Sequence, residues 1–187
     1  MHECQQEAIT NCEEFSIPKR NLTGFWAALV TVVGVVASVF HLYTGGFAAI
    51  STMDHRVIHL GLLLPLVFIA YAASSRDRNR IRWFDLMLAG LAVAASVYIL
   101  ATWRAQMTRI APPSSLETFL GCALIIVVIE AARRTTGLAL AGTATVFLAF
   151  ALLGPYFPGF LAHKGYSIQR LTSFLVMTAE GIYGTAM

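Results

Sequence analysis

Glu130, Arg133 and Arg134 place one carboxylate and two guanidinium groups close together, between two segments that are otherwise almost entirely apolar. Residues three and four apart share a face of a helix, so Glu130 can form an ion pair with either arginine. The pattern fits an ion pair that anchors a helix end at the membrane surface, a proton or ion relay, or a contact between subunits. A relay needs a carboxylate deep in the membrane. Glu130 lies about one helical turn from the end of its apolar segment, so the sequence favours the anchor.

The other residues suited to chemistry are a second carboxylate and three histidines. Asp85 opens an apolar segment, where a carboxylate complements the positive N-terminal end of a helix. His55 and His59 are four residues apart and can share a helix face, but a metal site would need further ligands nearby. We interpret these groups, and His41 near the end of an earlier apolar segment, as polar helix ends.

Cysteine usage and motifs indicate no catalytic, cofactor or metal site. Cys4 and Cys12 lie in a polar N-terminal segment and Cys122 lies in an apolar one, so we expect three free thiols rather than a disulfide framework. The sequence contains no Walker A motif, no G-x-S-x-G and no H-E-x-x-H. We therefore do not expect an enzyme.

The composition is that of an integral membrane protein. Of the 187 residues, 57% are hydrophobic and 12% are charged, with a net charge of +3, whereas soluble domains carry about 25% charged residues. The mean hydropathy is +0.69. Basic residues do not cluster with aromatic ones, so the sequence indicates no nucleic-acid surface.

Five apolar segments are long enough, or nearly so, to cross a bilayer, which takes about 20 residues. They are residues 25–44, 57–73, 84–103, 118–132 and 135–153. The fourth is short unless it starts near Ser115 and ends within the Arg133–Arg134 pair, whose side chains can reach the headgroups. Pro65 lies inside the second, where a proline kinks a membrane helix rather than ending it. The first is too long for a signal peptide and lacks a cleavage site, so we expect a retained span.

Positively charged loops predict the orientation. With the N-terminus in the cytoplasm, the cytoplasmic segments hold eight Lys and Arg residues and the other side holds five. The decisive loop is S-S-R-D-R-N-R-I-R, which is short and has four arginines. The Glu130–Gly137 segment then forms a cytoplasmic turn between the fourth and fifth spans.

Prolines and glycines interrupt residues 154–167, where aromatic side chains suit the membrane interface. Ser167 is a suitable N-cap for an amphipathic helix lying along the membrane surface or against a partner. Small residues four apart, Gly90 and Ala94 in the third span and Ala141, Thr145 and Ala149 in the fifth, indicate helix faces that allow close packing. The expected fold is an all-α integral membrane protein with about five transmembrane helices and a C-terminal amphipathic interfacial helix.

The second half resembles a known transporter family. I-E-A-A-R-R-T-T-G-L-A-L, G-P-Y-F-P-G-F-L-A-H-K-G-Y-S-I-Q-R-L and T-A-E-G-I-Y-G are similar to segments of fused TRAP transporter permeases of the TAXI type. H-L-Y-T-G-G-F and R-V-I-H-L-G agree more loosely. A proline commonly follows the leucine of G-x-x-L in that family, whereas Ala141 stands here.

The resemblance implies a cytoplasmic segment at 1–24, a four-helix small-subunit-like (DctQ-like) bundle at 25–134, and the first part of a large (DctM-like) transport module at 135–187. It also implies sodium-driven uptake of organic carboxylate anions across the bacterial inner membrane. The partners would be the rest of the DctM-like module, a periplasmic TAXI-type solute-binding protein and membrane lipids. The family's sodium and substrate sites lie in a part that would follow residue 187, so the resemblance implies a split permease, a truncated one or a fragment of one. The alternative is a stand-alone membrane scaffold or regulatory protein without transport activity.

Overall fold

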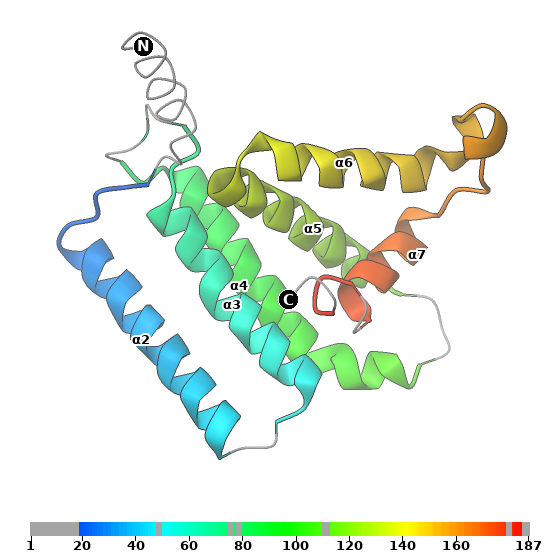
Figure 1. The fold of residues 1–187 in the computed structure, drawn as a ribbon. Helices are drawn as coiled ribbons and strands as arrows, with labels where there is room; N and C mark the ends of the chain where they lie inside the picture. The colour runs from blue at the N-terminus through cyan, green and yellow to red at the C-terminus, as the bar shows by residue number, and fades with distance from the viewer. Residues whose placement is uncertain are drawn as a thin grey trace, which may run out of the picture.

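The computed structural model describes residues 19–47, 50–74, 77, 80–109, 113–178 and 181–184. Within these residues, five helices are long and apolar enough to cross a membrane (Figure 1). They are α2 (Phe25–Gly46), α3 (Thr52–Ala70), α4 (Trp83–Met107), α5 (Ser115–Thr136) and α6 (Leu138–Leu153). A short helix, α7 (Ile168–Thr172), follows near the C-terminus. The structure confirms the expected all-α fold of a multi-pass membrane protein.

Helix boundaries follow the local sequence. The fourth span does extend to Ser115, because Ser114 caps α5: its hydroxyl accepts a hydrogen bond from the Glu117 amide at 3.3 Å, and the Glu117 carboxylate accepts one from the Ser114 amide at 2.6 Å. Its last turn contains Arg133 and Arg134, as expected. In α3 the helix continues through Pro65.

The core lies between α3, α4 and α5, and small residues allow the first two to approach closely. Ala92 and Ala95 on α4 are fully buried. A Cβ atom on Gly61 of α3 would lie 2.9 Å from the Cβ of Ser96 on α4, which is too close for any larger residue. Close approach of two helices matters within a membrane. Lipid tails are as apolar as leucine, so the association of helices there depends on van der Waals contact.

Two spans lie at the periphery. In α2 the only buried residue is Ala37, and in α6 it is Ala141. Figure 1 shows α2 at one edge of the α3–α4 pair, and α6 diverging from the bundle after a turn at the end of α5. The predicted small-residue face of α4 is open, since no atom of the described residues lies within 4 Å of a Cβ placed on Gly90. These surfaces are available to lipid or to another polypeptide.

The C-terminal segment returns to the bundle. Ser167 caps α7, accepting a hydrogen bond from the Arg170 amide at 3.3 Å, as the sequence predicts. A π-helical turn, η4 (Ser173–Met177), then continues the helix against α4 and α5. The face that packs inward contains Thr172 and Val176, whereas Ile168 remains exposed. Residues 168–177 therefore complete the core.

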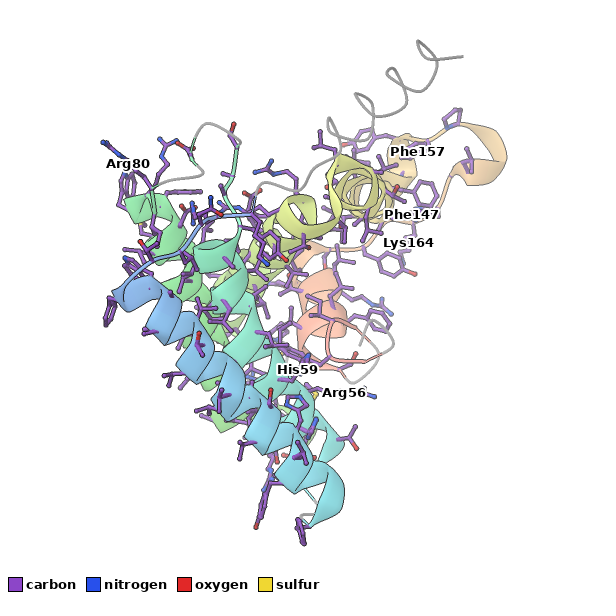
Figure 2. All side chains as sticks on the ribbon, turned by 60° about the vertical axis from the view of Figure 1, so that its left-hand side comes forward. Arg56, His59, Arg80, Phe147, Phe157 and Lys164 are labelled. Carbon is purple, nitrogen blue, oxygen red and sulfur yellow. The ribbon has the colours of Figure 1, made fainter. Side chains whose placement is uncertain are left out.

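Tyr183 extends this contact, since its side chain is fully buried in the main hydrophobic cluster. Burial raises the pKa of Tyr183, so the phenol stays neutral. Arg56, near the start of α3 (Figure 2), donates a 2.7 Å hydrogen bond to the Tyr183 carbonyl oxygen. This bond ties the returning segment to the bundle.

Gly121 allows α7 to approach α5, and its replacement should separate them. A Cβ atom at Gly121 would lie 2.1 Å from the Thr172 methyl group. We expect Gly121→Val to lower the free energy of unfolding by ~1–3 kcal/mol, because the added methyl groups overfill the contact. Cys122, whose sulfur lies 3.3 Å from the Thr172 hydroxyl, should react faster with a maleimide. The measurements are thermal unfolding in detergent and labelling in a Cys4→Ser/Cys12→Ser background.

Gly142→Val is the matched control, because Gly142 is an exposed helical glycine with open space around its Cα. If Gly121→Val and Gly142→Val gave the same melting temperature and the same Cys122 labelling rate, the close contact of α5 with α7 would be wrong.

Candidate functional site

Asp85 lies at the centre of a buried ionic network where α3 ends and α4 begins. Its carboxylate is held from two sides by guanidinium groups: Arg134 donates to one oxygen at 2.7 Å and Arg20 donates to the other at 2.5 Å. The Arg82 backbone amide also donates to the second oxygen at 3.1 Å. The exposed fractions of Asp85, Arg20 and Arg134 are 1%, 5% and 2%. This carboxylate is fully engaged and shielded from water.

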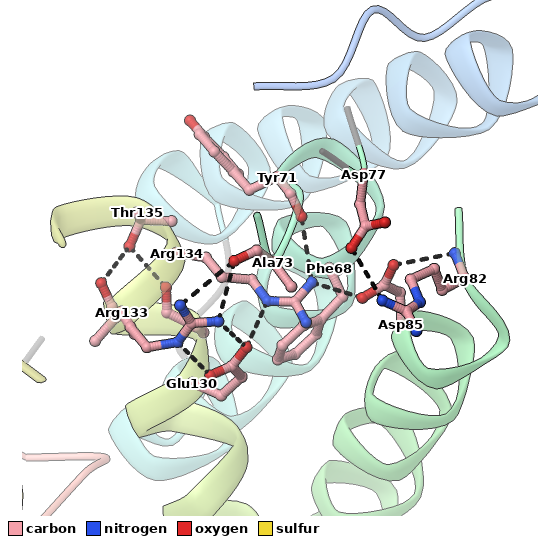
Figure 3. A network of polar contacts seen from close by, with 12 residues as sticks. Phe68, Tyr71, Ala73, Asp77, Arg82, Asp85, Glu130, Arg133, Arg134 and Thr135 are labelled. Carbon is pink, nitrogen blue, oxygen red and sulfur yellow. Dashed lines mark hydrogen bonds and ion pairs between the residues drawn. The ribbon is translucent and has the colours of Figure 1, made fainter. Parts of the chain in front are cut away.

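Arg20, Arg134 and the neighbouring Arg133 also bind carbonyl groups at the end of α3 and in the residues that follow it. The last four carbonyls of a helix lack partners within it and carry partial negative charge. Arg20 donates to the carbonyl oxygens of Phe68 and Ile69 at 2.7 and 3.2 Å. Arg134 donates to that of Tyr71 at 3.3 Å, and Arg133 to that of Ala73 at 3.4 Å (Figure 3).

Glu130 completes the network from α5. Arg133 binds it through two hydrogen bonds of 2.7 Å, and the Nε of Arg134 donates to it at 2.8 Å (Figure 3). Glu130 therefore pairs with both arginines, whereas the sequence left open which of the two it meets. The Arg134 guanidinium also lies over the Phe68 ring, 5.0 Å from its centre. We call Arg20, Asp85, Glu130, Arg133 and Arg134 the arginine clasp.

The geometry of the arginine clasp suits joining helices rather than moving protons. Three cations face two carboxylates, and each carboxylate accepts hydrogen bonds from two arginines. Arginine does not deprotonate in proteins, so it holds a bound carboxylate in its charged form. The arginine clasp connects the residues before α2 with the ends of α3 and α5 and the start of α4.

A second group of polar contacts lies at the opposite end of the bundle, where α3 begins and α4 ends. Asp54 accepts hydrogen bonds from the Trp103 indole at 2.6 Å and from Arg104 at 2.5 Å. Glu117, at the start of α5, accepts one from Arg109 at 2.5 Å. Asp54 thus joins α3 to α4, and Glu117 joins α5 to the residues that follow α4.

Three histidines meet between α2 and α3. His41 Nε2 and His59 Nδ1 are 2.6 Å apart, and the His55 ring lies 5.1 Å from the ring of His41. His41 Nδ1 also lies 2.6 Å from the Ala37 carbonyl oxygen, so that nitrogen must donate. In the neutral pair, His41 Nε2 then accepts the hydrogen of His59 Nδ1. This chain of hydrogen bonds ties α2 to α3.

The remaining candidates from the sequence are possible metal ligands and the cysteine thiols. Among the described residues, no group of three or more His, Cys, Asp or Glu side chains could hold a metal ion. Cys122 is a free thiol. Cys4 and Cys12 lie outside the described residues.

Sequence reasoning singled out four members of the arginine clasp and missed Arg20. It treated Asp85 as an isolated end charge and Glu130 with its arginines as a separate pair, whereas the structure brings them together through Arg134. Arg20 precedes the first span. The predicted topology puts Arg20 and Asp85 at the same end of the bundle, and this shared position could have suggested that they pair. It also missed the pairing of Asp54 with Arg104 and of His41 with His59.

Comparison with protein-family models, with curated proteins and with solved structures finds no match to this chain. The geometry itself supports a general description of the protein. It establishes a multi-pass membrane protein whose buried charges hold its helices together.

Removing the charge of Asp85 should strongly destabilise the bundle. Asp85→Asn leaves Arg20 and Arg134 buried without their shared counter-ion, and breaking a buried ion pair costs ~3–5 kcal/mol. We expect a large fall in the melting temperature and in the yield of folded protein, measured by thermal unfolding and size-exclusion chromatography in detergent.

Asp77→Asn is the matched control at the same end of the bundle. Its ion pair with Arg82 spans 3.1 Å, and the Arg82 side chain is 60% exposed, so its loss should cost about 1 kcal/mol or less. Equal melting temperatures for Asp85→Asn and Asp77→Asn would show that the arginine clasp contributes no special stability. Because Asp85→Asn could fail to fold, Glu130→Gln gives a second test with an intermediate expected effect, since its carboxylate is partly exposed.

Proposed function

We propose that this protein is the scaffold portion of a TAXI-type TRAP transporter permease. In this role it holds a DctM-like transport module in the membrane and takes part in sodium-driven uptake of organic carboxylate anions. The substrate would be delivered by a periplasmic TAXI-type solute-binding protein. The similarity of residues 129–184 to such permeases motivates the proposal.

The observation that carries the scaffold role is the use of the buried charges. Charged groups inside a membrane normally mark ion or substrate pathways. Here Asp85 and Glu130 are bound by arginines, and Asp54 and Glu117 are bound at the opposite end. None of these four carboxylates is left to coordinate a sodium ion or a substrate. A scaffold that works with a separate transport module is consistent with this pattern.

Peripheral helices supply the surface that such a scaffold needs. The outward faces of α2 and α6 carry large exposed apolar side chains, including Leu42, Val39 and Val146. A surface this apolar suits lipid or the helices of a transport module. The alternative, a stand-alone scaffold or regulatory protein, is favoured by the same exposed faces if lipid alone covers them.

Association with a transport module tests the proposal. We expect the full chain to copurify with a DctM-like polypeptide encoded in the same genome. The two together, with the binding protein, should give sodium-dependent uptake of a carboxylate into proteoliposomes. The chain alone should give none, because its carboxylates are already paired. If the chain is stable alone and copurifies with no DctM-like polypeptide, the stand-alone role replaces the scaffold role.

The proposed location is the bacterial inner membrane, with the N-terminus and the arginine clasp on the cytoplasmic side. In a background without native cysteines, Ser74→Cys should react with a membrane-impermeant maleimide only after the cells are permeabilised. Thr108→Cys, at the opposite end, should react in intact cells. Both side chains are exposed, so a failure to label reflects the membrane barrier. The reverse labelling pattern would contradict the orientation and leave the scaffold role standing.

A further inference from the structure

An apolar groove runs between α6 and the returning α7–η4 segment. It has a volume of about 560 Å³, within the range of ~300–1,000 Å³ that is typical of small-molecule sites. Phe147 and Leu148 of α6 line one side, and Leu171 and Phe174 line the other. The floor of the groove therefore offers only van der Waals contacts to an occupant.

The groove opens into a second hollow that is basic. This hollow has a volume of about 460 Å³, shares Tyr166 and Arg170 with the groove, and adds Lys164. No Asp or Glu occurs anywhere in residues 131–179. Among the described residues, neither Lys164 nor Arg170 forms an ion pair. The mouth thus carries two positive charges that no carboxylate of the described residues neutralises.

The loop that presents this mouth is fixed by its own contacts. His163 Nε2 donates to the Phe150 carbonyl oxygen at 3.1 Å, and its Nδ1 accepts from the Gly165 amide at 3.0 Å. The Tyr166 amide donates to the Ala151 carbonyl oxygen at 3.0 Å. The Arg170 guanidinium lies over the Tyr166 ring, 5.7 Å from its centre. Figure 2 shows Lys164 near the end of α6, with Phe147 and Phe157.

We propose that this groove binds one anionic glycerophospholipid. The phosphate would sit between Lys164 and Arg170, and an acyl chain would lie along the apolar floor beside Phe147. The end of α6 is where a membrane span of this length reaches the headgroups, and cations there attract anionic lipid. The inference requires only that α6 lies in a membrane, so it stands independently of the transporter assignment.

The shape and the charge together select a lipid over other occupants. A soluble anion would use the basic mouth but leave the apolar floor in contact with water. An apolar helix from a second copy of the chain would fill the floor but bury two cations without counter-ions, which is costly. A phospholipid with an anionic headgroup satisfies both parts of the site.

Lipid binding to the purified full-length protein tests the site. In detergent, native mass spectrometry and thermal unfolding should show that dioleoyl phosphatidylglycerol binds and stabilises more than dioleoyl phosphatidylcholine. Lys164→Gln and Arg170→Gln should each weaken the phosphatidylglycerol adduct about fivefold, as expected for one surface cation near anionic lipid. Ala144→Trp, which fills the groove and leaves the charges in place, should abolish the adduct. Arg80→Gln, which removes an exposed cation at the clasp end, is the control and should change nothing.

Several results would overturn the proposal. Equal binding of the two lipids, or an unchanged adduct in the Arg170→Gln and Lys164→Gln proteins, would show that the cations do not select the headgroup. Stabilisation by inorganic phosphate equal to that by phosphatidylglycerol would indicate a site for soluble anions. A dimer that phosphatidylglycerol does not dissociate, and that Ala144→Trp does, would assign the groove to a second copy of the chain.

Discussion

Placing a charged aspartate inside a helical bundle constrains everything around it. Asp85 is 1% exposed, and a buried carboxylate requires counter-charges and hydrogen bonds to offset the loss of water. Arg20 and Arg134 supply both, and each also donates to a carbonyl group at the end of α3. One set of donors therefore satisfies a buried carboxylate and a helix terminus together. The direction of four chain segments is fixed at this point.

The helices differ in how many of their residues are buried and in how they are joined to the bundle. Small residues bring α3 and α4 together, and α5 is secured by Arg134. By contrast, α2 contributes one buried residue and is joined to α3 through His41 and His59. Likewise α6 contributes one buried residue, Ala141. Among the described residues, the molecule thus has a tightly packed centre and two spans that bury little of their surface.

Hydropathy and charge were sufficient to predict the fold, because membrane spans are marked by long apolar segments bounded by polar ones. The cap at Ser167 and the extension of α5 to Ser115 also follow from local signals. Local sequence patterns could not predict pairings between residues far apart in the chain, such as Asp85 with Arg20 or Asp54 with Arg104. The burial of Tyr183 was also missed, because its sequence neighbourhood is rich in glycine and lacks an apolar period.

The burial of Tyr183 has a consequence for how the protein is made. Ribosomes deliver a membrane protein from its N-terminus, so α3, α4 and α5 enter the bilayer before residue 183 is synthesised. Until then, the space that Val176 and Tyr183 occupy has no protein to fill it. In the partly synthesised protein, that space is exposed to lipid or to the insertion machinery. Residues translated after all five spans thus complete the core between α3, α4 and α5.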